Sequence, residues 1–194
     1  MASRKVKIER KTRETDISLT LDPDTVAEPA VRTGIPFLDH MLTSMSFHGR
    51  FSLSVEGRGD IDVDPHHLVE DVGLVLGQAF SAAAEKAGSV ARFGHAVVPM
   101  DEALSEVTID VCGRPTLSLH ASFPQPSAGT FDLSLLREFF AGFASQARIS
   151  LHVELRRGEN SHHMAESAFK ALGKALKQAY SPDGREMSSK GRIG

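Results

Sequence analysis

An internal repeat is the feature of this sequence that most restricts what it can fold into. The segment Arg50–Glu56 reappears as Arg148–Glu154, with five of seven residues identical. Downstream, the fifteen residues beginning at His66 match those beginning at His162, sharing two histidines, a glutamate, a leucine, a glycine and an alanine. Because unrelated segments rarely match twice in the same order, the pattern predicts one structural unit used twice.

A third match sets the limits of the two halves. Residues 37–48 align over residues 135–146 without a gap. We therefore expect a first half-domain at 1–90, a second at 91–180 and a short tail at 181–194. With 194 residues, the chain is long enough to bury a hydrophobic core.

Within each half, the hydrophobic spacing predicts both strands and helices. Alternating apolar residues mark strands at 17–21, 51–55 and 107–111. Helical spacing marks helices at 37–47, 133–147, 64–88 and 160–180. Asp64 with Pro65, and Asn160 or Ser161, are suitable residues to begin the two longer helices. The order strand, strand, helix, strand, helix predicts an α+β fold in which each half packs a β-sheet on two helices.

Composition and charge restrict the class of protein. A net charge of −3 and the lack of a long basic run give no electrostatic basis for binding nucleic acid. The sequence has no apolar stretch of membrane-spanning length, and its charged start is unlike a secretory signal. The single cysteine, Cys112, fits a reducing compartment. We expect a cytoplasmic protein that binds neither nucleic acid nor membranes.

Histidine is the unusual component of the composition. Of nine histidines, four form the adjacent pairs His66-His67 and His162-His163. A glutamate follows each pair, Glu70 or Glu166, at a spacing that puts it beside both histidines on a helix. Adjacent helical side chains diverge by about 100°, so we expect two ions, each taking one histidine from each pair. Imidazole and carboxylate donors without thiolate favour Mn, Fe, Zn or Ni.

The alignment indicates one further metal donor in each half. His40 lies over Glu138, and both residue types can ligate such an ion. Each half would then combine a helical donor with a His-His-x-x-Glu motif. His152 aligns with a serine, so the repeat does not support it as a ligand. His95 and His120 have no assigned role and are interpreted as histidines of the core.

At these motifs the sequence resembles the imidazoleglycerol-phosphate dehydratase family. The resemblance runs from about residue 4 to residue 191 and rests on Arg10–Thr15, Gly34–Leu42, His48-Gly49, Asp64–Asp71, Arg92–Gly94, Met100–Leu104, Gly113–Pro115, Asn160–Glu166 and Phe169–Ala171. It implies a lyase of histidine biosynthesis, which dehydrates D-erythro-imidazoleglycerol phosphate to imidazoleacetol phosphate. It also implies duplicated half-domains of the ribosomal S5 domain 2-like or ferredoxin-like type. The resemblance further implies a 24-subunit homo-oligomer with sites shared between subunits. Each site would hold two Mn²⁺ ions or other divalent transition metals.

The resemblance implies roles for individual residues. Glu14 would be the catalytic acid/base, with His48 and Lys170 near the substrate. Substrate and phosphate would be bound by Glu14, His40, His48, His66, Arg92, Arg114, His162, Lys170, Ser188, Ser189 and Lys190, the last three from the tail. Together with the repeat, the expected metal ligands are His40, His66, His67, Glu70, Glu138, His162, His163 and Glu166.

The chain departs from the family pattern at a few positions. Glu138 stands where the family commonly has His, Ser44 where Gln is frequent, and Met187 alters the tail motif. Of these, Glu138 alone belongs to the expected metal ligands, and a carboxylate is an acceptable ligand for Mn²⁺. Asp71, Asp101 and Glu102 are interpreted as supporting or structural residues.

The implied reaction has a chemical difficulty that metal ions would relieve. The leaving hydroxyl is on the carbon attached to the imidazole, and the proton lost is on the next, poorly acidic carbon. A metal at a ring nitrogen favours the imidazolate, whose electrons can expel hydroxide and leave a diazafulvene-like intermediate. Loss of the neighbouring proton then gives the enol of the ketone.

Three other classes of function stay open at this point. A di-metal hydrolase would need two ions about 4 Å apart that share a water. A non-catalytic shell protein assembled by metal would not turn over the substrate. Nucleic-acid binding rests on fold analogy alone and lacks a basic stripe.

Overall fold

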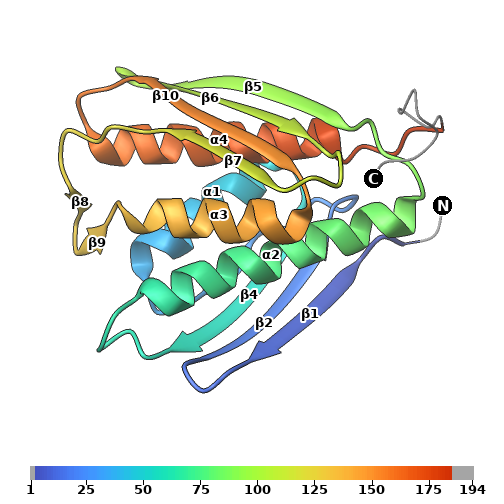
Figure 1. Cartoon of the computed structure of the whole chain (residues 1–194), viewed down its shortest axis with the longest axis horizontal. Coiled ribbons are helices and arrows are strands. Elements are labelled where there is room, and N and C mark those ends of the chain that lie inside the picture. The colour runs from blue at the N-terminus through green and yellow to red at the C-terminus, as the bar shows by residue number, and fades with distance from the viewer. Residues whose placement is uncertain (1–2, 185–194) are drawn as a thin grey trace.

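The computed structural model describes residues 3–184 (Figure 1). Its strands are β1 (Val6–Lys11), β2 (Thr15–Asp22), β3 (Ala30–Arg32), β4 (Ser52–Gly59), β5 (Phe93–Met100), β6 (Ala103–Asp110), β7 (Thr116–His120), β8 (Ser127–Ala128), β9 (Phe131–Asp132) and β10 (Ser150–Arg157). Its helices are α1 (Pro36–Gly49), α2 (His66–Ala87), α3 (Leu135–Ala147) and α4 (Ser161–Ala179). Both halves follow the order of three strands, a helix, a strand and a helix, and the second half adds the β8–β9 hairpin.

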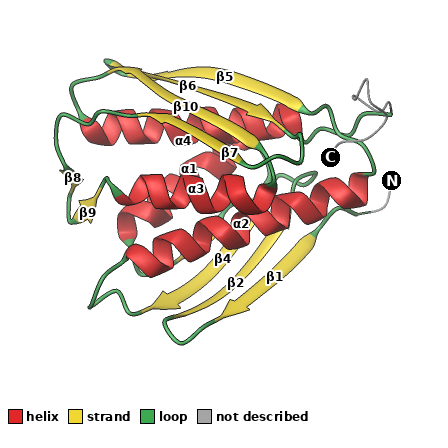
Figure 2. Ribbon diagram, in the orientation of Figure 1, coloured by secondary structure: helices red, strands yellow, loops and turns green. Residues whose placement is uncertain are grey.

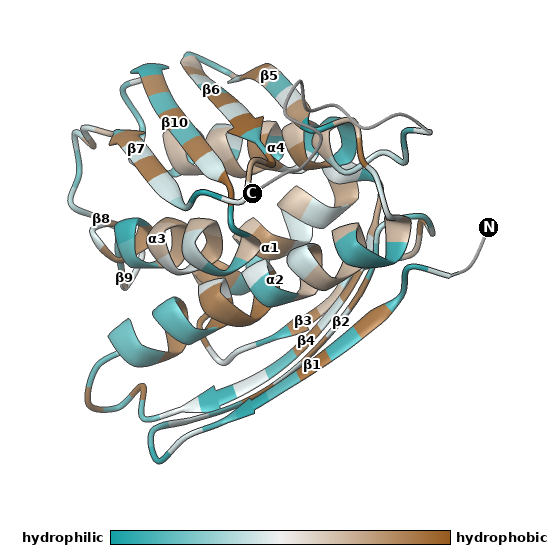
Figure 3. Ribbon diagram, turned by 45° about the vertical axis from the view of Figure 1, so that its right-hand side comes forward, coloured by the Kyte–Doolittle hydropathy of each residue, from teal (hydrophilic) through white to brown (hydrophobic). Residues whose placement is uncertain are grey.

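Two four-stranded sheets enclose the layer of helices (Figure 2). Their strand orders, β1-β2-β4-β3 and β5-β6-β10-β7, are equivalent, and in each the last strand runs parallel to its neighbour. Apolar and polar residues alternate along the strands, visible as bands in Figure 3, because one face of each sheet packs on helices. The predicted α+β fold of two sheet-plus-helix halves is confirmed.

The predicted order of elements misses one strand of each four-stranded sheet, and in the second half it also misses the β8–β9 hairpin. The two strands missed from the four-stranded sheets, β3 and β7, lie at the edge of a sheet and pair in parallel with the strand that follows the next helix. They lack clean alternation, since β3 is only three residues long and β7 has no fully buried residue. Glu14 lies in the turn between β1 and β2.

The two halves share one helical layer and one hydrophobic core. Helix α1 packs on α4, and α2 packs on α3, so each helix pair combines the two halves. The glycine shared by the repeats explains these crossings: a Cβ at Gly77 would collide with the carbonyl oxygen of Phe143, and one at Gly173 with that of Met45. Phe143 and Met45 are themselves repeat equivalents. The two crossings therefore rest on equivalent contacts. The predicted boundary near residue 90 falls in the link between α2 and β5.

The ends of α2 and α4 place the paired histidines in first helical turns. Asp64 accepts a hydrogen bond from the backbone N–H of His66, and Asn160 accepts from those of His162 and His163. These are the cap interactions that short polar side chains make with unpaired backbone donors. Among the described residues, no helix combines the length and hydropathy that a membrane span requires.

Candidate active site

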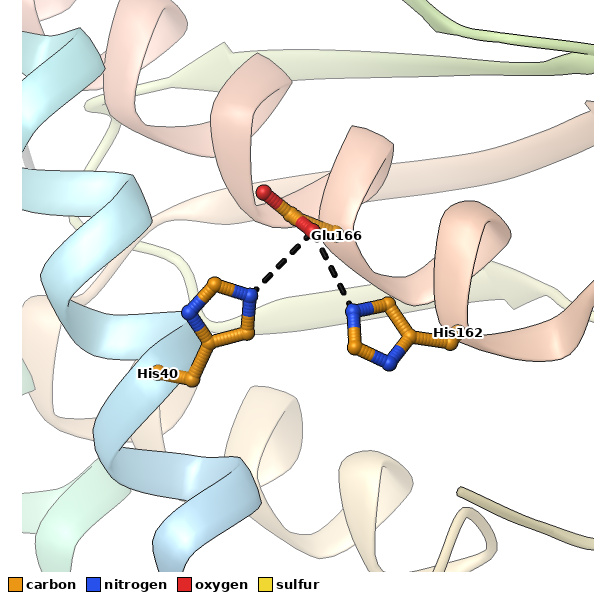
Figure 4. Close-up of side chains that lie close together, drawn as sticks. All are labelled: His40, His162 and Glu166. Carbon is orange, nitrogen blue, oxygen red and sulfur yellow. Dashed lines mark hydrogen bonds and ion pairs between the residues drawn. The ribbon is translucent and has the colours of Figure 1, made fainter. Parts of the chain in front are cut away.

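Three expected metal ligands come together where α1 crosses α4 (Figure 4). His40 Nε2 lies 3.2 Å from Glu166 Oε2, and His162 Nε2 lies 3.3 Å from the same oxygen. The ligand atoms of the three residues all lie within 4.8 Å of one another. His40 thus meets the motif of the other half, whereas the sequence suggested a donor and motif within each half.

The carboxylate of Glu166 is the centre of this cluster. It is buried, and it also contacts Lys170 Nζ at 3.0 Å and Ser44 Oγ at 3.4 Å. Burial opposes ionisation of Glu166, but hydrogen bonds from Lys170 and His40 outweigh it and lower the pKa. The pKa of His48 is also lowered, by burial and by the charges of Lys170 and Lys174. Glu166 is therefore an anion and His48 a neutral imidazole at neutral pH.

This donor set fits a divalent transition metal. Two imidazole nitrogens and a buried anionic oxygen are ligands that Mn²⁺, Fe²⁺ and Zn²⁺ accept. Side chains from two helices of different halves supply them, so the crossing fixes their spacing. We call His40, His162 and Glu166 the α1–α4 cluster.

Each half also pairs the second histidine of its motif with acidic groups. His163 Nδ1 lies 2.9 Å from Glu102 Oε2, and the hydrogen bond raises the pKa of His163. The same bond, with the backbone N–H of Asn160, lowers the pKa of Glu102 to about 2. A carboxylate on one ring nitrogen orients a histidine and leaves the other nitrogen for a ligand.

The corresponding pair in the first half is looser. His67 Nδ1 lies 3.4 Å from Asp60 Oδ2 and 3.8 Å from Glu14 Oε2. The strand registers make Glu14 the counterpart of Glu102, because Leu19 and Val107 pair with equivalent residues of β4 and β10. The sequence alone hides this equivalence, since the two hairpins share no motif.

The repeat places Glu138 opposite α2, as it places His40 opposite α4. One turn beyond Glu138, a Cβ at Gly142 would approach the carbonyl oxygen of Glu70 to 2.9 Å, so the two helices are close here. Within residues 3–184, however, Glu138 does not join His66 and Glu70 in a compact cluster. Ligation by Glu138 stays a prediction.

We expect Glu138→Ala to lower affinity for one of two ions and to remove most turnover, because an open coordination position replaces a protein donor. Glu138→His should keep two ions and appreciable activity, since imidazole is an alternative donor. Arg137→Ala, which changes the exposed neighbouring residue, is the control and should be nearly silent. Metal stoichiometry and kcat check these outcomes. Two tightly held ions and full activity in Glu138→Ala would make this carboxylate a surface charge.

The expected phosphate contacts lie far from the α1–α4 cluster. Arg92 pairs with Asp110 through two nitrogens, at 2.6 and 3.1 Å, and its backbone N–H donates to the carbonyl of Ala179 at the end of α4. The carbonyl of Arg114 lies near Ser150, which pairs with Asp110 across the sheet. Thirteen residues of helix separate Glu166 from Ala179, a distance of about 20 Å.

Three further histidines lie on the second sheet. His95, His120 and His152 are exposed on strands of the second sheet, where His95 pairs with Glu106. The interpretation of His95 and His120 as core histidines is therefore wrong. Ser188, Ser189 and Lys190, and with them most of the predicted phosphate-binding tail, lie outside the described residues. Sequence reasoning missed Asp60, the contact of Ser44 with Glu166 and the hydrogen bonds of Asp71, because such contacts join segments that are apart in the chain.

Comparison with known proteins identifies the family. The imidazoleglycerol-phosphate dehydratase family profile matches residues 33–176. The enzymes of this name from Acidithiobacillus ferrooxidans and Pseudomonas paraeruginosa are each 46% identical over 185 residues, covering 95% of this chain and 93% and 94% of theirs. Crystal structures of the dehydratases from Pyrococcus furiosus and Staphylococcus aureus match with TM-scores of 0.84 and 0.81 at 36% identity. They cover 95% and 92% of this chain and 99% of each solved chain.

The fold and site define a duplicated α+β protein with a histidine–carboxylate cluster between its halves. The chain belongs to the imidazoleglycerol-phosphate dehydratase family. This membership supports a dehydratase function in histidine biosynthesis.

Proposed function

We propose that the chain dehydrates D-erythro-imidazoleglycerol phosphate to imidazoleacetol phosphate with Mn²⁺ as cofactor. The observation that carries the proposal is the α1–α4 cluster, because its three donors match a divalent transition metal and all lie within residues 33–176, which the family profile matches. When bound, such ions would act as Lewis acids that favour the imidazolate form of the substrate ring. The reaction would then pass through the diazafulvene-like species expected from the sequence.

The side chains of the protein would bind, orient and transfer protons. His40, His162 and Glu166 would hold an ion, and Lys170 keeps the Glu166 carboxylate charged. Glu14, whose side chain is largely exposed beside α2, is free to take the proton from the carbon next to the departing hydroxyl. Neutral His48 can exchange a proton or accept a hydrogen bond from the substrate.

We further propose that copies of the chain in a homo-oligomer, expected to be a 24-mer, share each site. About 20 Å of helix separates the α1–α4 cluster from the arginines expected to bind phosphate. A substrate of one ring, three carbons and a phosphate is far shorter, so it cannot contact both regions of one chain. A neighbouring copy would have to supply Arg92 and Arg114. The cytoplasmic location stays a prediction.

The experiment combines metal analysis with turnover. Protein purified with Mn²⁺ should contain two ions per chain and convert the substrate, whereas chelated protein should be inactive until Mn²⁺ returns. One ion or none would contradict the two-ion proposal. Bound metal without turnover would favour the metal-assembled shell protein. Ions about 4 Å apart that share a water would favour the hydrolase.

A further inference from the structure

A buried carboxylate ties the hairpin that carries Glu14 to helix α2. Asp71 is 7% exposed and has two partners from this hairpin. Arg10 Nε donates to its Oδ1 at 2.8 Å, and the Thr15 hydroxyl donates to its Oδ2 at 2.5 Å. Hydrogen bonds that involve an ionised group are the stronger kind, so both partners are held firmly against α2.

The main chain around Glu14 is fixed at three further points. The hydroxyl of Thr12 accepts hydrogen bonds from the backbone N–H groups of Glu14, at 3.1 Å, and Thr15, at 2.9 Å. The carbonyl of Glu14 accepts from the backbone N–H of Asp60 at 3.2 Å. The Glu14 side chain itself is 56% exposed, so its position depends on this anchored backbone rather than on packing.

The second half folds in the same way without this carboxylate. Ser167 occupies the position equivalent to Asp71, and the strand register makes Ala103 the counterpart of Thr15. Ser167 is buried and contacts Ser105 at 2.6 Å, an interaction between neutral hydroxyls. Since the repeated fold does not require an acid here, Asp71 has a role specific to the first half. Through Arg10 and Thr15, Asp71 is hydrogen-bonded to the hairpin whose turn carries Glu14.

We infer that Asp71 is a positioning residue, which acts through Thr15 and Arg10 to hold Glu14 beside the first turn of α2. There the Glu14 carboxylate comes within 3.8 Å of His67. The inference rests on the proposed function, in which Glu14 transfers the proton. A misplacement of about 1 Å in a reacting group can cost about 10²-fold in rate, so a fixed hairpin affects turnover directly.

The test is a double-mutant cycle on the Mn²⁺-loaded protein. Asp71→Asn should lower kcat by about 10- to 100-fold, with KM within about twofold and metal content unchanged. Thr15→Val should do the same, and Thr15→Ser should restore kcat because it keeps the hydroxyl. Asp16→Asn is the matched control, since Asp16 pairs with Lys11 on the exposed side of the same hairpin.

The decisive measurement is made in the Glu14→Gln background. Asp71→Asn should change kcat there by less than about twofold, because a residue that acts through Glu14 has no effect once Glu14 is inactive. The inference would be overturned if Asp71→Asn lowered kcat by the same factor in the Glu14→Gln background as in wild type. It would also be overturned by normal kcat in both Asp71→Asn and Thr15→Val. Either result would leave the proposed function intact. Normal kcat in Glu14→Gln would overturn the role of Glu14 and this inference with it. If Asp71→Asn does not fold, the two Thr15 variants carry the same test.

Discussion

Glu14→Gln should lower kcat by about 10²–10⁴-fold, the usual contribution of a general acid/base. Glutamine keeps the size of the side chain but can neither accept nor return a proton at the substrate carbon. Glu14 is not in the α1–α4 cluster, so the number of bound ions should stay the same. Steady-state kinetics and elemental analysis of one preparation separate these two effects.

A matched control for this variant lies in the same hairpin. Glu9 is exposed on β1 and pairs with Lys7, so Glu9→Gln makes the same chemical change away from α2. It should leave kcat within about twofold, as surface substitutions usually do. A near-normal kcat for Glu14→Gln would remove this residue from the mechanism.

Glu166→Gln should lose the ion of the α1–α4 cluster and nearly all turnover. Glu166 is the shared partner of His40, His162 and Lys170, and it is buried. Glutamine offers one neutral carbonyl oxygen and leaves the Lys170 ammonium without its anion. Replacing a residue that merely orients a metal ligand lowers metal affinity by about 10–100-fold. Because Glu166 is itself the expected ligand, Glu166→Gln should lower metal affinity by more than that.

Metal retention during titration with a chelator measures this effect without relying on activity. Wild type should release its ions at a higher chelator concentration than Glu166→Gln. Glu154→Gln, an exposed change on β10, is the control and should behave as wild type. Glu166→Gln with wild-type metal affinity would show that the cluster is a hydrogen-bonded structural group instead.

The sequence by itself determined the repeated unit, its α+β composition and the residues with the capacity to bind metal. Each depends on local information. Alternation of apolar residues predicts a half-buried strand, and Asp64 and Asn160 fix the first turns in which the histidine pairs stand. Short edge strands were missed because β3 and β7 pair through distant residues and carry little pattern of their own.

Only the tertiary structure decided which of these residues meet. His40 lies 126 residues before Glu166, and it reaches this carboxylate rather than the motif of its own half because α1 crosses α4 at a glycine. The equivalence of Glu14 and Glu102 became visible through strand register, since their hairpins share no motif. Likewise, the hydrogen bonds of Asp71 join a helix to a hairpin more than fifty residues away. Helix crossings and strand registers are set by packing of the whole core. The sequence pattern therefore predicts which residues can bind metal or transfer protons, whereas the packing determines which of them are in contact.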